Sequence, residues 1–361
     1  MNMKYMLEND EAIKQRLDEF YNGVEKNITE LPQNSTTKYA LFSDLHMGDG
    51  NKKVDCFVHN EETMNSALNY YKEKDYSLIF MGDIEDLWIF DLNRIKNKYD
   101  EKIYSLIRSF EAKKVYRIFG NHDSEWKRPS DPFLNSDETL DKSPEAIKLG
   151  DDIFLFHGHQ GDYNCDKVAW FSKFWVRNFG KLFNIIGKTF FNYENRSATK
   201  SQIPKDRERL FYNWAKKKKV ILICGHTHNA IFASRSYYWW LKEQIEIKEK
   251  KLAKLQSTED EVRKNRLSKR IDKLKNELLN EEKKGRKYYR ITAKGREPLP
   301  CYFNTGCGLF KKGITNIEIE GDKIRLIKWK KRKSLPLERK RKVLGEKSLS
   351  EIREEINVKS L

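Results

Sequence analysis

The feature of this sequence that most constrains its fold is a series of short apolar runs, each leading directly into a polar cluster. Five runs of four or five residues have the length and composition of strands buried on both faces: 39–42, 77–81, 115–119, 153–156 and 220–224. Helical patterns separate the first three runs, for example at 56–74 and 87–110. Short buried strands that alternate with helices predict an α/β fold with parallel crossovers.

The polar clusters that follow these runs hold six of the seven histidines, and in chain order they read SDLHMGDG, GDIEDLW, GNHD, HGHQGD and GHTHNA. Open α/β sheets bind ligands outside the carboxyl ends of their strands, and all five clusters fall there. The candidate metal ligands are imidazoles, carboxylates and one amide: Asp44, His46, Asp83, Asn121, His157, His226 and His228. Such a set without thiolate suits Mn, Fe, Ni or Zn, and its size favours two ions over one.

Two metal ions close together need a shared anionic bridge, and Asp83 is the carboxylate that we favour for it. Asp123 either supports the site or caps the turn that follows it.

The ordered set DLH, GDxxD, GNHD, HGH and GHTH resembles the calcineurin-like metallophosphoesterases over about residues 38–229. The resemblance implies a four-layer αββα sandwich, which is an α/β fold with two sheets flanked by helices. It also implies one metal bound by Asp44, His46, Asp83 and His228, and a second bound by Asp83, Asn121, His157 and His226. His122 matches the family's catalytic histidine, and Asp86 matches the carboxylate that orients it.

The expected reaction is hydrolysis of a phosphoester or pyrophosphate bond by metal-activated hydroxide. Two divalent ions, with Mn favoured and Fe, Ni or Zn as alternatives, would lower the pKa of a bridging water for in-line attack on phosphorus. His122 would protonate the leaving oxygen or stabilise the transferring phosphoryl group. The chain lacks the GxxxxGK[ST] loop, which argues against nucleotide hydrolysis by that route.

The substrate stays open between two branches of the family. GDxxDLW, and HGHQGD followed by an aromatic helical insert, are similar to the UDP-2,3-diacylglucosamine diphosphatases, although those enzymes more often have arginine where this chain has His122. SDLHMG with GNHD is similar to the nuclease branch that acts with a coiled-coil ATPase. The arginine of the protein phosphatase motif GDxVDRG is missing here, which argues against a protein phosphatase. A different class of function is a non-catalytic binding module.

Outside the motifs, the sequence predicts a helix and linker over 1–36, a phosphoesterase domain over 37–327 and a basic tail over 328–361. A helical insert at 162–219 is expected to overhang the metal site, as a substrate lid, a membrane-facing surface or a subdomain with its own core. A charged helical hairpin at 239–285, with two apolar seams, is expected to project from the far side of the second sheet. It would either bind a protein partner or nucleic acid or serve as a solvated spacer. The tail carries nine basic residues against one acid over 328–342.

The 361 residues carry a formal net charge of +17, which predicts an anionic partner. A phosphorylated substrate is one such partner, and nucleic acid or an anionic membrane surface at the basic tail is another. The hairpin is a candidate surface for a protein partner. Five irregularly spaced cysteines indicate reduced thiols. Because no apolar signal segment or membrane-spanning run is evident, we expect a cytoplasmic protein, with a peripheral membrane contact left open.

Overall fold

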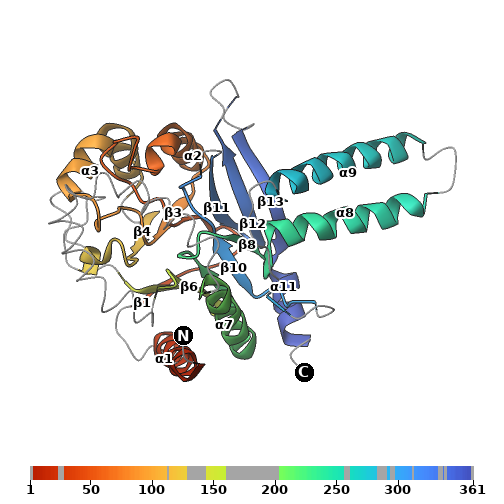
Figure 1. Cartoon of the computed structure of the whole chain (residues 1–361), viewed down its shortest axis with the longest axis horizontal. Helices are drawn as coiled ribbons and strands as arrows, with labels where there is room; N and C mark the ends of the chain where they lie inside the picture. Colours follow the sequence, from red (N-terminus) through yellow and green to blue (C-terminus); the bar gives the residue numbers. More distant parts are fainter. Residues whose placement is uncertain are drawn as a thin grey trace.

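The computed structural model describes residues 3–22, 28–111, 114–127, 144–159, 203–255, 261–282, 291–292, 297–310, 313–331, 336 and 340–358. Two β-sheets pack against each other in the centre of the protein, and helices lie on their outer faces (Figure 1). The predicted α/β sandwich is confirmed.

One sheet has six strands in the order β13-β12-β11-β2-β3-β4. Its parallel half consists of β2 (Lys38–Phe42), β3 (Ser77–Met81) and β4 (Val115–Ile118). Its antiparallel half consists of β11 (Gly313–Glu320), β12 (Lys323–Lys330) and β13 (Arg341–Ser348). Because β2, β3 and β4 run in the same direction, the loops after them meet at one edge of the sheet.

The other sheet has seven strands in the order β1-β5-β6-β7-β10-β8-β9. Parallel pairing joins β6 (Ile153–Phe156), β7 (Ile221–Cys224) and β10 (Tyr302–Thr305) at its centre. The remaining strands are β1 (Ile28–Leu31), β5 (Ala146–Leu149), β8 (Ala230–Phe232) and β9 (Arg235–Ser236). This pairing brings the loops after β6 and β7 side by side.

Two apolar clusters hold the layers together. The first packs Tyr71, Tyr99 and other helical side chains against Trp329 and its neighbours on the six-stranded sheet. The helical elements on that face are η1 (Phe57–Asn60), α2 (Glu61–Glu73), α3 (Leu92–Tyr99), the π-helical turn η2 (Asp100–Tyr104) and α4 (Ser105–Arg108). The second cluster fills the space between the sheets and continues under α1 (Met3–Tyr21) and α7 (Ile203–Lys218). A short 3-10 turn, η4 (Ser124–Lys127), follows the loop after β4.

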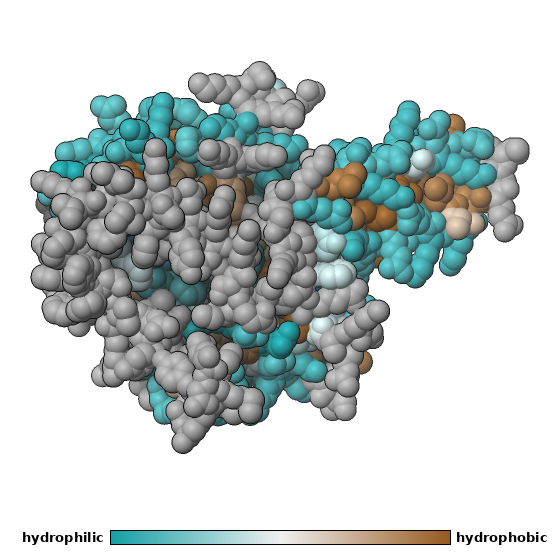
Figure 2. All heavy atoms as spheres, in the orientation of Figure 1, coloured by the Kyte–Doolittle hydropathy of each residue, from teal (hydrophilic) through white to brown (hydrophobic). Residues whose placement is uncertain are grey.

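In the region of the expected hairpin, α8 (Tyr237–Ala253) and α9 (Glu261–Glu282) run side by side and project away from the two sheets (Figure 1). α8 begins directly after β9, the edge strand of the seven-stranded sheet, and α9 returns toward the sheets. Leu241, Ile245 and Ile271 are buried along the apolar seam. Figure 2 shows hydrophilic side chains over most of the visible hairpin surface, with apolar residues between the two helices.

The structure corrects the expectation of a separate basic tail over 328–361. Residues 341–358 form β13 and α11 (Leu349–Val358), and β12 extends into this region as far as Lys330. Several of the basic side chains meet carboxylates of distant segments, for example Arg341 with Glu318 and Arg353 with Asp152 at 2.7 Å. The density of basic residues along the chain predicted a tail. The carboxylates that neutralise these residues lie far away in the sequence, so the local pattern did not show them.

Other predictions from the sequence change in detail, or concern residues that the structure does not describe. The linker expected before residue 37 contains β1, which pairs in parallel with β5. Of the helical insert at 162–219, residues 162–202 lie outside the described residues, and α7 covers 203–218. The four cysteines of the described part form no disulfide, and Cys165 lies outside it. None of the described helices is both long and apolar enough to cross a membrane.

Candidate active site

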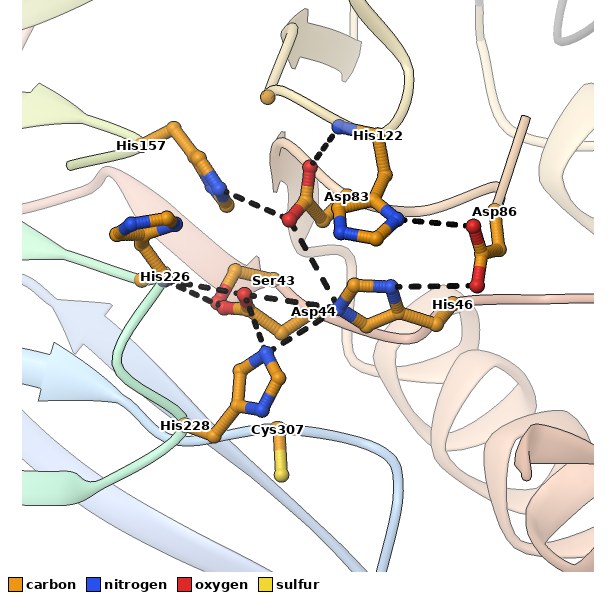
Figure 3. Close-up of polar contacts among 12 residues, drawn as sticks. Ser43, Asp44, His46, Asp83, Asp86, His122, His157, His226, His228 and Cys307 are labelled. Atoms are coloured by element: carbon orange, nitrogen blue, oxygen red, sulfur yellow. Dashed lines mark hydrogen bonds and ion pairs between the residues drawn. The ribbon is translucent and has the colours of Figure 1, made fainter. Parts of the chain in front are cut away.

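The loops at the carboxyl ends of five strands bring the candidate site residues together (Figure 3). Each residue lies within five positions of the end of its strand: Asp44 and His46 after β2, Asp83 and Asp86 after β3, Asn121 and His122 after β4, His157 after β6, and His226 and His228 after β7. The first three strands belong to one sheet and the last two to the other. The site therefore lies across the junction of the two sheets.

Backbone strain is concentrated in these loops. Five of the site residues adopt a left-handed backbone conformation: Asp44 (φ 53°), His46 (φ 48°), Asp83 (φ 53°), His226 (φ 67°) and His228 (φ 57°). This region is uncommon for residues other than glycine, and it persists where the surrounding structure enforces it, often at functional sites. The loops thus bring these side chains together even though their residues adopt an unfavourable backbone conformation.

One group of candidate ligand atoms comes from Asp44, His46 and His228, whose donor atoms all lie within 4.8 Å of one another. The Nε2 atoms of His46 and His228 are 3.2 Å apart, and His228 Nε2 is 3.3 Å from Asp44 Oδ1. Burial, together with the nearby His122, holds the pKa of His46 well below its usual value. A neutral imidazole with a free lone pair is the form that binds a metal.

A second group comes from Asp83, His157 and His226. His157 Nδ1 donates a hydrogen bond to the carbonyl oxygen of Met81 at 2.8 Å, which leaves Nε2 as the nitrogen that faces Asp83 Oδ2 at 3.2 Å. Fixing one imidazole nitrogen on a carbonyl is how proteins orient a metal-binding histidine. Burial and the neighbouring His157 lower the pKa of His226 well below its usual value.

Asp83 lies between the two groups. Its Oδ2 is 3.2 Å from His157 Nε2 and 3.8 Å from His46 Nε2, and its Oδ1 accepts a hydrogen bond from the backbone N–H of His122 at 2.8 Å. Burial would raise the pKa of Asp83, but His157 and the other histidines hold it well below its usual value. Asp83 is therefore an ionised carboxylate within reach of both groups.

Two buried atoms test whether these residues fit a metal. Asn121 Oδ1 is buried and has no hydrogen-bond partner. His157 Nε2 faces the ionised Asp83 Oδ2 at 3.2 Å, and the proton that this carboxylate holds on the ring occupies a position that a metal cation could take. A buried amide oxygen left without a partner, such as Asn121 Oδ1, costs about 1–3 kcal/mol, which a cation on its lone pair would offset. Together with the nitrogen and oxygen donors around them, these atoms fit divalent metal ions.

His122 lies beside these groups and has its own support. Its Nδ1 is 2.8 Å from Asp86 Oδ1, so Nδ1–H can donate a hydrogen bond to the carboxylate, which leaves Nε2 for chemistry. Trp88 stacks on the imidazole, with ring centroids 4.0 Å apart and an interplanar angle of 22°. Trp88 Nε1 in turn donates to the carbonyl oxygen of Asn121 at 2.8 Å. Asp86 therefore holds the His122 ring at its edge, and Trp88 holds it on its face.

A family model for the calcineurin-like phosphoesterases matches residues 37–230 of the chain. The chain belongs to this family. Its members are hydrolases that act on phosphate esters and use divalent metals, so this phosphoesterase is an enzyme with a phosphorylated substrate. Comparison with curated proteins gave no match.

The sequence did not identify several residues that hold the loops of the phosphoesterase together. Asp123, whose role was left open, accepts hydrogen bonds from the backbone N–H of Ile84 at 2.9 Å and of Gly120 at 2.5 Å. Buried Arg117 donates to Asp123 at 3.0 Å and also pairs with buried Glu85. Asp123 therefore joins the loops after β3 and β4 and supports the site. The sequence signal for this support was Arg117, a charged residue inside the apolar run of β4.

A second support comes from α7. Glu208 is fully buried, and its Oε1 accepts hydrogen bonds from Thr227 Oγ1 at 2.5 Å and from Asn229 Nδ2 at 3.2 Å. Both partners lie in the loop after β7 that carries the two candidate ligands of that strand. Nothing in the local sequence pattern of α7 distinguishes Glu208 from a surface glutamate, so only the fold assigns it this role.

Proposed function

We propose that this phosphoesterase is a dinuclear metal-dependent enzyme that hydrolyses a phosphoester or pyrophosphate bond. The observation that carries the proposal is the pair of candidate ligand groups with Asp83 between them. One ion would be held by Asp44, His46, Asp83 and His228, and the other by Asp83, Asn121, His157 and His226. The family match and the unpartnered Asn121 Oδ1 support this assignment.

Two bound divalent ions would supply a water of lowered pKa and would offset the negative charge that develops on the phosphoryl oxygens. Manganese is the native metal that we propose, because the donors are imidazole, carboxylate and amide. His122 would donate a proton from Nε2 to the leaving oxygen or stabilise the transferring phosphoryl group. Asp86 would fix its tautomer, and Trp88 would hold its ring plane.

For the substrate we propose a phosphodiester or pyrophosphate, with two candidates carried by the motifs. The UDP-diacylglucosamine-type pyrophosphate is supported by the GDxxDLW motif, whose tryptophan stacks on His122. DNA is supported by the SDLHMG and GNHD motifs. A cytoplasmic location, with or without a peripheral membrane contact, stays part of the proposal.

The test is a hydrolysis panel on the purified, metal-depleted protein after addition of Mn, Ni, Zn or Mg. The substrates are bis-p-nitrophenyl phosphate, p-nitrophenyl phosphate, single-stranded DNA and a UDP-linked acyl sugar. We expect metal-dependent turnover that His122→Ala lowers by about 10²–10⁴-fold without loss of bound metal. His59→Ala is the matched control, because His59 lies in η1 outside the site. Wild-type turnover in His122→Ala, or none with any metal, would contradict the proposal.

A further inference from the structure

The α8–α9 hairpin carries a strong excess of positive charge on α9. Between residues 263 and 275 the helix has one acidic residue, Asp272, and seven basic residues: Arg263, Lys264, Arg266, Lys269, Arg270, Lys273 and Lys275. All of the seven except Lys264 are exposed. Charges on a helical hairpin are commonly solvated or paired. The arrangement of these residues therefore decides whether they form a surface that can bind an anionic partner.

The two flanks of the hairpin differ in how their charges are arranged. On one flank Lys275 pairs with Glu249 at 2.7 Å, and on the outward face of α8 Lys250 pairs with Glu246 at 2.8 Å. On the other flank, burial and the nearby Arg270 and Lys251 lower the pKa of Lys248. These three cations form no ion pair with a carboxylate of the described residues. Like charges are thus gathered on one flank and neutralised on the other.

The helical repeat extends this cluster into a stripe along α9. Residues three or four positions apart share one face of a helix, so Arg263, Arg266, Arg270 and Lys273 lie in a row. We call this row the basic stripe. Over ten residues at 1.5 Å each it is roughly 15 Å long. A DNA duplex carries one negative charge for about every 1.7 Å of its axis, so a basic row of this length faces several phosphates.

The hairpin holds the stripe in a defined place relative to the two sheets. Glu277 of α9 accepts a hydrogen bond from Tyr237 at 2.5 Å and pairs with Lys342 of β13 at 2.5 Å. Tyr238 also bonds to Glu282 at 3.2 Å. These contacts lie at the base of the hairpin, while the stripe lies toward its outer end (Figure 1). A polyanion bound there would be held at a fixed distance from the two sheets.

We propose that the basic stripe binds the sugar–phosphate backbone of a nucleic acid. Arginine guanidinium groups bind phosphate oxygens in a bidentate manner, and three of the four stripe residues are arginines. A membrane surface fits less well, because a helix that lies on a bilayer needs an apolar face to insert. The outward face of α9 instead carries the exposed polar residues Asn265, Ser268, Asp272 and Asn276. The exposed apolar residues of this helix, Val262 and Leu279, lie near its two ends, roughly 25 Å apart at 1.5 Å per residue, and form no continuous apolar face. The proposal does not depend on catalysis by the candidate active site.

The test is fluorescence anisotropy of the full-length protein with a labelled 25-base-pair DNA duplex and with single-stranded DNA and RNA of the same length. Chelator is present so that no probe is cut. The stripe variant is Arg266→Gln with Arg270→Gln. The matched control is Lys250→Gln with Lys275→Gln, which removes the same charge from two hairpin lysines that are paired with carboxylates.

We expect the stripe variant to weaken duplex binding at least about tenfold and to reduce the slope of log Kd against log salt by about 2, while the control stays near wild type. Equal weakening in both variants would mean that net charge alone attracts the probe, and it would overturn the proposal. So would wild-type protein that binds none of the three nucleic-acid probes. Because the probes report binding without turnover, failure here leaves the proposed phosphoesterase function untouched.

Discussion

The loops of the candidate active site and the α8–α9 hairpin use charged side chains in opposite ways. In the loops, carboxylates and imidazoles are buried, held by strained backbone, and placed within a few ångströms of one another. On the hairpin, the charges lie on regular helices in solvent, and like charges gather along one flank. Burial makes each group of the loops depend on its neighbours, whereas exposed groups act nearly independently. The comparison predicts large effects in the loops and small, additive effects on the hairpin.

The largest effect should come from Asp83, the carboxylate between the two candidate ligand groups. Asp83→Asn keeps the shape of the side chain but removes the charge that both groups share, so we expect turnover to fall by about three orders of magnitude or more. Metal content, measured by elemental analysis, should fall below two equivalents. Asp91→Asn, at the N-cap of α3, is the control and should retain turnover. Full metal content and turnover in Asp83→Asn would remove Asp83 from the site.

The next effect is the pH dependence of metal affinity. Burial alone would lower the pKa of His157, but the Asp83 carboxylate raises it to about 9 in the metal-free protein. The ring is therefore protonated at neutral pH, and a metal must displace that proton. Between about pH 6 and pH 9 we expect affinity to rise by about tenfold per pH unit for one displaced proton.

Titration calorimetry in two buffers of different ionisation enthalpy measures the number of protons released. His157→Gln should bind metal more weakly and lose that proton from the count. A proton count that is the same in wild type and His157→Gln would contradict the assignment.

A smaller effect should come from Trp88, which stacks on His122. Trp88→Ala removes the stacking, and we expect kcat to fall by about tenfold with little change in KM, because the imidazole loses orientation rather than substrate binding. Trp88→Phe keeps an aromatic face and should recover part of kcat. If both variants lose the same amount, the hydrogen bond from Nε1 to Asn121 matters and the stacking does not.

The smallest effect should come from the base of the hairpin. Lys342 and Tyr237 lower the pKa of Glu277 against the opposing effect of burial. A carboxyl group with a lowered pKa in the folded state stabilises it above the unfolded pKa, and this contribution is lost as pH falls through the folded pKa. The protection of α8 and α9 against hydrogen exchange, corrected for the intrinsic pH dependence of amide exchange, should therefore fall in acid. Glu277→Gln should show faster exchange at neutral pH and a weaker acid dependence, and an unchanged profile would rule out this contact.

The strands and the loop residues were predictable because their signals are local. Each strand is a short apolar run, and the residues that follow it reach the same edge through parallel pairing. The structure brings together all nine residues named from the motifs, and their roles stay predictions. Asp123 could not be assigned from its position alone, because its partners Ile84 and Arg117 belong to other segments.

What the sequence determined by itself is the order of buried strands, the ligand-type residues at their carboxyl ends, and membership of the calcineurin-like phosphoesterases. Only the tertiary structure decided which charges are neutralised. Residues 341–358 read as part of a basic tail, yet Arg353 meets Asp152 across 201 positions of sequence. Among the described residues, Lys248, Lys251 and Arg270 of the hairpin lie close together with no carboxylate paired to them. Strand and helix patterns repeat over a few residues, whereas the partner of a charge is set by how distant segments pack.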